Sequence, residues 1–489
     1  MPPLPATSEA TLYAALADWL QGRIASGALA PETRLPSIRR MSKQRGVSIA
    51  TVVQAYRLLE DRGQIEARPQ SGYYVRTSAA AARAGNAPVP RMPPAAPQPR
   101  EVEISSLMSR VMAEARDPSL VPLGAGCPSG ELYPHDKLAR FLAAAARQDS
   151  IGLTHYRIAY TAPELAAQLA RRALLDGYSL EPSEIIATNG CIEALQIALR
   201  TVTRPGDVVV VESPTYFTFL EILESLGLRT IEVPAHPVDG VSLEALEMAL
   251  EQHPVKAFLL VANAQNPLGC TLTDEKKRRI AELCADFGVV IIEDEINADL
   301  HFGESRPKPI RALAVGGDIV TCGSFSKTLA PGLRVGWIAG GRLTEKLRNT
   351  RSICSMSSPA VIQQGVAAFL ASGGYDHHLR TIRRVYAGQL QRMSGAVLEH
   401  FPEGVRLSRP AGGFFLWVEM PAGVDAIRLH DDALAASIST APGPAFSARA
   451  RFKSCLRLNC AVAWSPRVEH AVATLGRLAR EQLQRPSPP

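Results

Sequence analysis

The chain has 489 residues, 46% of them hydrophobic, and a formal net charge of +6. Because ordinary domains contain about 100–200 residues, this length predicts two or three folded units rather than one. No apolar run approaches the roughly 18 residues that span a bilayer, and the N-terminus lacks the basic and apolar regions of a signal peptide, so we expect a cytoplasmic protein with no membrane segment.

The cysteines and the charges narrow the possible functions. The eight cysteines form no CxxC pair and the ten histidines show no metal-ligand spacing, which predicts reduced thiols and no metal site. Residues 1–100 contain 13 Lys and Arg against 6 Asp and Glu, whereas residues 101–489 contain 40 against 41. A basic surplus confined to the N-terminal fifth is expected if that part binds a polyanion.

The first predicted element is a helix over residues 8–26, with Ser8 as its N-cap and Gly27 as its stop. Apolar residues recur there at every fourth position, which places one helical face in a core: Leu12, Leu16, Leu20 and Ile24. A strongly periodic segment of this length predicts an amphipathic helix.

Two shorter helices follow in LPSIRRMSKQRGVSIATVVQAYRLLEDRG. Ser37 can cap the first helix, Gly46 breaks it, and Ser48 can cap the second. Two helices joined by a tight glycine turn form a helix-turn-helix. The next stretch, QIEARPQSGYYV, has β-rich ends around a Gln-Ser-Gly turn and predicts a small hairpin, so residues 8–76 are expected to form a winged helix-turn-helix domain that is mostly α.

Residues 77–104 are rich in alanine and then in proline, and they cannot build a core. We expect them to form an extended linker, which could span about 70 Å if it adopted a polyproline-like conformation. From residue 105 to residue 485, short β-branched runs alternate with helical patterns, for example in DVVVVES, KAFLLVANA, GVVIIEDE and DIVTCGS. This alternation predicts buried parallel strands with helical crossovers, and GGFFLWVEM and SCLRLNCAVA predict strands of a smaller α+β subdomain.

The helix-turn-helix pattern favours DNA binding, because such a motif lays its second helix in the major groove. The alternative is a solvated basic face on two ordinary helices. The segment from Gly27 to Val75 resembles the GntR-family winged helix-turn-helix in RLPSIR, GVSIATV, AYRLLEDRG and SGYYV. This resemblance implies double-stranded operator DNA as the partner. The expected contact residues are Arg34, Arg39, Ser48, Thr51, Arg68 and Gly72. Ile49 stands where many family members have arginine.

A second constellation surrounds the only lysine of SFSKTLAPGLRVGW, Lys327. A lysine that forms a Schiff base with pyridoxal phosphate needs partners for the ring nitrogen, the phenolic oxygen, the ring face and the phosphate. Asp294 follows a buried strand and can pair with the ring nitrogen, Asn266 can donate to the phenolic oxygen, and Tyr216 can stack on the ring. The expected phosphate ligands lie at a strand-to-helix turn and around the lysine, and they are Gly190, Cys191, Ile192, Ser324 and Arg334.

The joint order of these motifs over residues 105–480 resembles fold-type I aminotransferases. The resemblance is carried by NPLG, the Asp294 strand, SFSKTLAPGLRVGW and CLRLN. It implies that Arg457 binds the carboxylate of an amino acid ligand. It also implies that Tyr156 reaches the phosphate of a neighbouring subunit in a homodimer. One departure stands out, because Asn297 occupies the place where aminotransferases usually have a tyrosine that tunes the Schiff base.

A winged helix joined by a long linker to an aminotransferase-like domain resembles the MocR subgroup of the GntR regulators. It implies a transcription factor that senses pyridoxal phosphate, or an amino acid or amine, through an aldimine at Lys327, with no enzyme activity of its own. The alternatives are a working aminotransferase with an accessory DNA-binding domain and a scaffold without cofactor. Turnover and retention of the cofactor distinguish these three possibilities.

Overall fold

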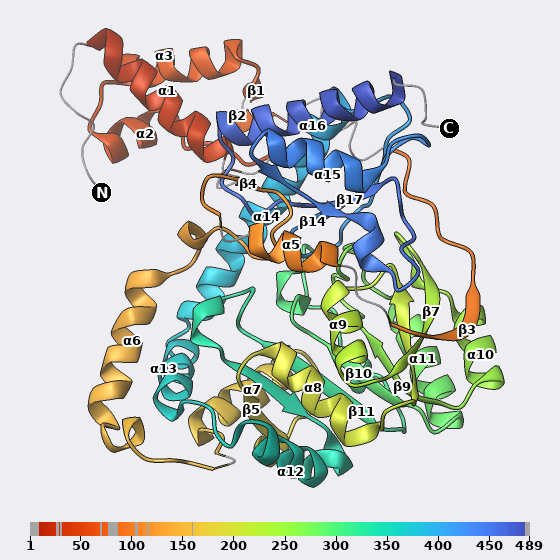
Figure 1. Cartoon of the computed structure of the whole chain (residues 1–489). Helices are drawn as coiled ribbons and strands as arrows, with labels where there is room; N and C mark the ends of the chain where they lie inside the picture. Colours follow the sequence, from red (N-terminus) through yellow and green to blue (C-terminus); the bar gives the residue numbers. More distant parts are fainter. Residues whose placement is uncertain are drawn as a thin grey trace.

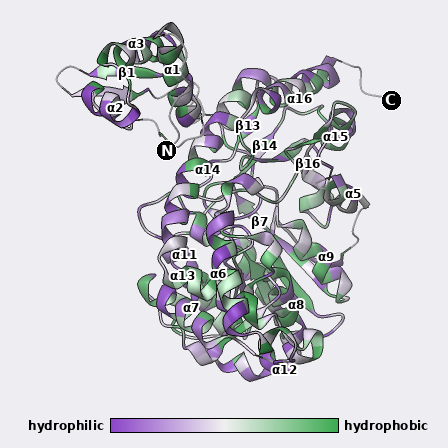
Figure 2. Ribbon diagram, turned by 90° about the vertical axis from the view of Figure 1, so that its left-hand side faces the viewer, coloured by the Kyte–Doolittle hydropathy of each residue, from purple (hydrophilic) through white to green (hydrophobic). Residues whose placement is uncertain are grey.

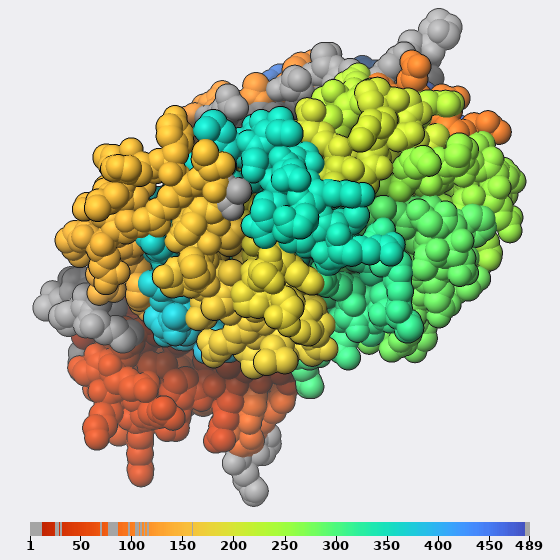
Figure 3. All heavy atoms as spheres, turned by 90° about the horizontal axis from the view of Figure 1, so that it is seen from below, coloured from red at the N-terminus to blue at the C-terminus, as the bar shows by residue number. Residues whose placement is uncertain are grey.

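The structure is a computed structural model that describes residues 9–25, 29, 32–68, 71–76, 87–102, 106–114, 117–158 and 160–484. A small N-terminal domain projects from a large α/β domain, which carries a smaller α+β subdomain near the C-terminus (Figures 1 and 3). The predicted helix caps Ser8 and Gly27 lie outside the described residues. None of the helices in the described parts of the chain has the length and apolar character that crossing a bilayer requires.

The N-terminal domain is a three-helix unit with a β-hairpin, as predicted. Its elements are α1 (Glu9–Ala25), α2 (Ile38–Arg45), α3 (Ile49–Asp61), β1 (Ile65–Arg68) and β2 (Gly72–Val75). Ser37 and Ser48 cap α2 and α3 through their side chains, and Gly46 ends α2 in the left-handed conformation with φ 65°. These caps satisfy backbone groups that the helix ends leave free, which fixes the turn between the two helices.

This domain has a core of its own. Leu16, Leu20, Val52, Tyr56 and Leu59 are all at most 1% exposed and belong to one cluster. Figure 2 shows the contrast within the domain, since α2 is mostly hydrophilic while α1 and α3 carry the hydrophobic faces. The domain therefore needs no apolar surface from the rest of the chain to form its core.

The large domain is built on one nine-stranded sheet. Its strands are β3 (Ala96–Glu101), β5 (Ile185–Thr188), β6 (Val208–Ser213), β7 (Arg229–His236), β8 (Gly240–Val241), β9 (Val255–Leu260), β10 (Val290–Asp294), β11 (Ile319–Ser324) and β12 (Gly336–Ala339). The order is β3-β7-β6-β9-β10-β11-β12-β5, with β8 beside β7. The pairs from β7 to β11 are parallel, whereas β3 and β12 run antiparallel to their neighbours. The four predicted parallel strands are thus confirmed as β6, β9, β10 and β11.

Helices cover both faces of this sheet, which explains why its strands are almost wholly buried. The covering helices are α7 (Pro163–Leu175), α8 (Cys191–Val202), α9 (Phe217–Ser225), α10 (Leu243–Gln252), α11 (Asp274–Asp286), α12 (Thr344–Ser355) and α13 (Ala360–Ala371). Two further helices lie outside these layers: α6 (His135–Gln148) packs on α13, and α5 (Ser106–Glu114) lies against Phe217 and Trp417 between the large domain and the subdomain (Figure 1).

The smaller subdomain contains the other two predicted strands. Its elements are β13 (Arg406–Leu407), β14 (Phe415–Glu419), α15 (Ala426–Ala435), β15 (Ile438–Ser439), β16 (Ala441–Pro442), β17 (Cys455–Asn459) and α16 (Pro466–Gln484), and β15 pairs with β4 (Val121–Pro122). Its four-stranded antiparallel sheet has the order β13-β14-β17-β16. The long helix α14 (Gly374–His400) joins the two parts, since Tyr375 lies in the core of the large domain and Val397 lies in the core of the subdomain.

The second half of the linker differs from the expectation of a free tether. The Leu407 amide donates to the carbonyl of Pro88 at 2.9 Å, and the Arg91 amide donates to the Glu419 carboxylate at 2.7 Å. Farther along, β3 pairs with β7 as an edge strand (Figure 1). Residues 87–101, called the docked linker below, are therefore held on the large domain and its subdomain. The polyproline pattern did not reveal this, because backbone pairing at a sheet edge needs no particular side chains.

Candidate functional site

A pocket opens where the carboxyl ends of the central parallel strands meet, which is the usual place for ligands in open α/β sheets. Side chains from far apart in the sequence line it: Gly126, Cys191, Ile192, Tyr216, Val261, Asn266, Asp294, Ile296, Asn297, Ser326, Lys327, Arg334 and Phe415. Eight of the ten residues predicted to hold the cofactor lie among these thirteen or, for Gly190, directly beside them; together with Lys327 the structure therefore brings most of the predicted site together.

Lys327 lies on the turn that follows β11, and its ammonium group points across the pocket. Nζ donates to the carbonyl of Gly126 at 2.7 Å and lies 3.4 Å from the Sγ of Cys127. Sequence reasoning missed Gly126 and Cys127, because they are about 200 positions away in the chain. The glycine before CPSG was the one feature of this segment that could have indicated a close approach of its backbone to another group.

Asp294 ends β10 on the floor of the pocket. It is 2% exposed, and its Oδ1 accepts hydrogen bonds from the Ile296 amide at 2.9 Å and from the Cys191 thiol at 3.1 Å. Burial raises the pKa of Asp294 to about 6, because a carboxylate loses its hydration there. Among the described residues Asp294 forms no ion pair, and a buried carboxylate of this kind is complementary in charge to a protonated pyridine nitrogen.

The anion-binding end of the pocket is formed by Arg334 and the start of α8. Arg334 donates to the carbonyl of Asn189 at 2.9 Å and to the hydroxyl of Ser326 at 3.3 Å. Gly190 precedes α8 with φ 93°, and a Cβ atom at that position would overlap the Arg334 guanidinium. The free amides of a helix N-terminus beside a guanidinium form a suitable phosphate site.

The predicted phosphate ligand Ser324 does not line this pocket. Its hydroxyl accepts from the Ser326 amide at 3.2 Å, and its side chain faces a separate polar cavity beside Arg172 and Arg306. Ser326 lines the pocket instead. The reason is that β11 ends at Ser324, so Ser326 lies in the turn that carries Lys327, whereas Ser324 is still part of the strand.

Three further predicted residues surround the centre of the pocket. Tyr216 precedes α9 and packs on Phe217 with ring centroids 4.7 Å apart. The Asn266 side-chain oxygen accepts from Arg457 at 3.2 Å. Asn297 donates to the carbonyl of Ala264 at 3.1 Å, while its Oδ1 is buried with no hydrogen-bond partner in the described part of the chain. The side-chain amide at position 297 thus has an unused acceptor oxygen and no phenolic hydroxyl.

Arg457 lies on β17 and is fully buried. Its guanidinium donates to the carbonyl of Gly124 at 2.7 Å, and its Nε has no hydrogen-bond partner among the residues described. Three phenyl rings surround it, with the guanidinium carbon 4.3 Å from the centre of Phe415, 5.2 Å from Phe446 and 5.7 Å from Phe217. Burial lowers the pKa of Arg457 to about 10, because the charged guanidinium loses its hydration there.

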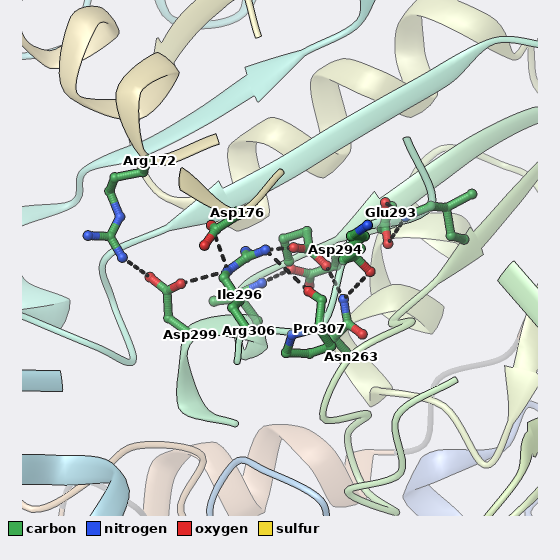
Figure 4. Close-up of polar contacts among 12 residues, drawn as sticks. Arg172, Asp176, Asn263, Glu293, Asp294, Ile296, Asp299, Arg306 and Pro307 are labelled. Carbon is green, nitrogen blue, oxygen red and sulfur yellow. Dashed lines mark hydrogen bonds and ion pairs between the residues drawn. The ribbon is translucent and has the colours of Figure 1, made fainter. Parts of the chain in front are cut away.

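A partly buried ion network holds the segment that carries Asp294 and Asn297 (Figure 4). Arg306 contacts Glu295 at 2.7 Å, Asp299 at 2.8 Å and Asp176 at 3.3 Å. Arg172 contacts Asp299 at 3.4 Å. Although burial opposes the charged form, Arg172 and Arg306 hold the pKa of Asp299 well below its usual range. The network therefore fixes both ends of the turn between Asp294 and Asp299.

Tyr156 lies away from the pocket of its own chain. It is 80% exposed and stands among exposed apolar residues, since Ile151, Leu153 and Ile158 are 65%, 62% and 62% exposed. The structure therefore places Tyr156 where it cannot contribute to the pocket of the same chain.

The helix-turn-helix surface differs in part from the predicted contacts. Arg34, Arg39 and Gly72 are exposed. Thr51 is only 5% exposed, and its hydroxyl lies 2.8 Å from that of Ser48, so both hydroxyls belong to the N-cap of α3. Ser48 and Thr51 were predicted to contact DNA, and Ser48 was also predicted to cap α3. In the structure the hydroxyls of both residues take part in the cap.

The wing arginine is also partly engaged within the domain. Arg68 contacts Glu32 at 2.5 Å and Glu66 at 2.7 Å. Sequence reasoning singled out Ile49 at the start of α3 but missed three further outward-facing residues of this helix, Ala50, Gln54 and Arg57. They lie on the face of α3 opposite the buried Val52, Tyr56 and Leu59. The helical periodicity of these apolar residues could have predicted which side chains point outward.

Comparison with known proteins agrees with both halves of the molecule. Residues 12–75 match the gntR family of bacterial regulatory proteins, and residues 119–475 match aminotransferase class I and II. The chain is 38% identical over 475 residues to the uncharacterized HTH-type transcriptional regulator YdcR of Escherichia coli, covering 96% of this chain and 99% of that protein. It is 29% identical over 421 residues to the probable rhizopine catabolism regulatory protein MocR of Rhizobium meliloti, covering 84% and 82%.

Solved structures are similar to the C-terminal part. The multiple substrate aminotransferase of Thermococcus profundus has a TM-score of 0.72 and 25% identity, and it covers 78% of this chain and 97% of its own. LysN, the alpha-aminoadipate aminotransferase of Thermus thermophilus, was solved with N-(5'-phosphopyridoxyl)-L-leucine and has a TM-score of 0.71 and 28% identity, with 78% and 96% covered.

Together, the two domains define a DNA-binding transcriptional regulator with an aminotransferase-like domain. The chain belongs to the MocR subgroup of the GntR regulators.

Proposed function

We propose that this regulator binds pyridoxal phosphate covalently at Lys327 and senses an amino acid or amine that enters the same pocket. When bound, the cofactor supplies an aldehyde that condenses with amines. Lys327 Nζ would hold that aldehyde, Asp294 would pair with the ring nitrogen, and Arg334 with the amides at the start of α8 would bind the phosphate. The buried carboxylate of Asp294 fits this role, because it forms no ion pair among the described residues and its Oδ1 is held in place by the Ile296 amide and the Cys191 thiol.

One observation favours a ligand that carries a carboxylate. Arg457 is a fully buried cation whose Nε is unpartnered in the described structure, and its Nη1 donates to Asn266, which lines the same pocket as Lys327. A buried charge without a compensating partner is costly, and a carboxylate would compensate it. We therefore infer that amino acids, rather than amines without a carboxylate, are the preferred effectors.

The test is a titration of each standard L-amino acid against the cofactor-loaded protein, read by the absorbance of the cofactor and by binding to duplex DNA. We expect at least one amino acid to change both readouts. Lys327→Ala should remove the yellow colour of the purified protein, while Lys137→Ala on α6 should retain it. A colourless wild-type protein that takes up no added cofactor would contradict the proposal.

The second candidate function is an active aminotransferase. It is less favoured because Asn297 offers no phenol near the lysine. Mixing the protein with an amino acid and a keto acid decides the question. Repeated turnover at rates typical of enzymes, roughly 1 to 1,000 per second, would contradict a purely regulatory role.

We also infer that the regulator is a homodimer. Tyr156 and the exposed apolar residues around it form a surface that a second copy would cover, namely Ile151, Leu153 and Ile158. Light scattering gives the mass in solution. A monomer at micromolar concentration in the presence of cofactor would contradict this inference.

A further inference from the structure

The loop that leads into β17 holds the docked linker. In residues 447–454, called the clamp loop below, Arg449 donates to the carbonyl of Gln98 at 3.2 Å and Arg451 donates to the carbonyl of Pro94 at 2.7 Å. The clamp loop, linker residues 90–94 and Trp417 line one groove. The linker is therefore gripped by side chains of the strand connection that precedes Arg457 by only a few residues.

The clamp loop has an unusual backbone. Ala450 and Phe452 both lie in the left-handed region, with φ 48° and 61°, although neither is glycine. Such conformations cost roughly 1–3 kcal/mol each and persist only where the surroundings hold them. Two of them within three residues mark a segment that small changes in packing can shift.

A continuous series of aromatic contacts joins the pocket to the clamp loop. Phe446 covers the Arg457 guanidinium, and its ring centroid lies 5.3 Å from that of Trp417. Trp417 in turn lies 5.7 Å from Phe452 of the clamp loop, with an interplanar angle of 81°. Trp417 and Arg457 are also direct neighbours on β14 and β17. Movement of Arg457 therefore cannot leave the packing under the clamp loop unchanged.

Glu232 supports the same loop from the large sheet. Its buried carboxylate accepts from the Ala448 amide at 3.2 Å and lies 3.8 Å from Arg449, while its backbone pairs with Ala96 of the docked linker. The loop and the linker thus share one support on β7, and they are expected to loosen or tighten together.

We propose that a ligand carboxylate on Arg457 tightens the hold of the clamp loop on the docked linker, so that the pocket controls how firmly the segment leading to the DNA-binding domain is held. This inference rests on the proposed function, because it needs a carboxylate ligand at Arg457. The physical basis is linkage. A ligand that fixes β17 and its aromatic neighbours makes opening of the loop packed on them less frequent. Because the coupling free energy is reciprocal, a change that loosens the loop must weaken the ligand by the same factor.

The test uses two stable adducts that differ only in the carboxylate: N-(5'-phosphopyridoxyl)-glycine and N-(5'-phosphopyridoxyl)-methylamine. Titration calorimetry with the full-length protein first establishes that both adducts bind. Hydrogen exchange of the amides in residues 89–101 is then measured with each adduct. We expect about 5-fold slower exchange with the glycine adduct, which is the lower end of ordinary allosteric coupling.

Arg451→Ala removes one grip on the linker, and Arg428→Ala on α15 is the matched loss of an exposed arginine from the same subdomain. Arg451→Ala should abolish the difference in exchange and weaken the glycine adduct about 5-fold relative to the methylamine adduct, whereas Arg428→Ala should do neither. Equal exchange with both adducts bound would overturn the coupling alone. Failure of both adducts to bind would overturn the proposed function and the coupling with it.

Discussion

Gly190 and Arg334 occupy each other's space so closely that a single methyl group on the glycine would overlap the guanidinium. Gly190 also has φ 93°, a conformation that other residues rarely adopt. The glycine thus lets the arginine reach the start of α8, where the carbonyl of Asn189 accepts its hydrogen bond at 2.9 Å.

Gly190→Ala should therefore displace Arg334 and reduce the affinity for pyridoxal phosphate by at least about 10-fold, because a lost hydrogen bond to a charged group costs about 1.5–3 kcal/mol. The matched control is Gly206→Ala. Gly206 has nearly the same φ, 89°, but open space around the position of a Cβ atom. Cofactor binding is measured by absorbance titration. Equal losses in both variants would assign the effect to backbone strain instead.

Asp294→Asn should have opposite effects on stability and on cofactor binding. Burial raises the pKa of Asp294 from 3.8 to about 6, so the folded protein favours the neutral acid, and stability is lost as the pH rises toward 6. At pH 8, a neutral amide should raise the free energy of unfolding of the cofactor-free protein by about 3 kcal/mol at most, since a shift of one pKa unit corresponds to about 1.4 kcal/mol.

The gain should shrink near pH 4, where the aspartate is largely neutral in the folded protein. Urea unfolding at the two pH values gives both numbers. The same variant should retain far less cofactor, since the amide cannot stabilise a protonated ring nitrogen. Cofactor affinity equal to that of the wild type would show that Asp294 has no role in binding.

Arg457→Met tests the buried cation directly. Replacing an uncompensated buried charge with an apolar side chain of similar length is often neutral or stabilising, so thermal unfolding without ligand should change little. The affinity for N-(5'-phosphopyridoxyl)-glycine should fall 10- to 100-fold, as expected for loss of hydrogen bonds to a charged group. The methylamine adduct serves as the control ligand. A parallel loss for both adducts would mean that the substitution damages the pocket as a whole.

Arg39→Ala and Arg68→Ala should differ in their effect on DNA binding. Arg39 is exposed on α2, whereas Arg68 already contacts Glu32 and Glu66. In titrations of a random 40-base-pair duplex at several salt concentrations, Arg39→Ala should lower the slope of log affinity against log salt by about 0.9, the value for one phosphate contact.

Arg68→Ala should change that slope less, because Glu32 and Glu66 already compensate its charge within the domain. Absorbance of the bound cofactor is the internal control and should be the same in both variants. If Arg68→Ala lowered the slope more than Arg39→Ala, the wing rather than α2 would make the main phosphate contact.

Much of the fold could be predicted from local pattern. The caps at Ser37 and Ser48, the αL glycine at position 46 and the β-branched runs of β6, β9, β10 and β11 each carry their own signal, and all are confirmed. The docked linker could not be predicted in this way. Its contacts are mostly to backbone carbonyls, as in the bond from Arg451 to Pro94, and these leave no trace in the composition of the segment.

The site was predictable to the extent that its residues follow strands. Asp294 is the last residue of β10, Lys327 lies three residues after the end of β11, and adjacent parallel strands bring their carboxyl ends together. Ser324 is the last residue of β11 and is absent from the lining of the pocket, so its role as a phosphate ligand stays a prediction. The rings around Arg457 could not be foreseen, since Phe217 and Phe446 reach it from 240 and 11 positions away along the chain.

The docked linker also has a consequence for the layout of the operator. With residues 87–101 held, the chain between Arg76 and Ala87 spans at most about 40 Å, whereas release as far as Val102 would extend this reach to about 90 Å. The difference of about 50 Å exceeds one turn of B-DNA, which is about 34–36 Å. Whether the linker is held therefore decides which separations between two binding sequences a pair of winged helices can bridge at the same time.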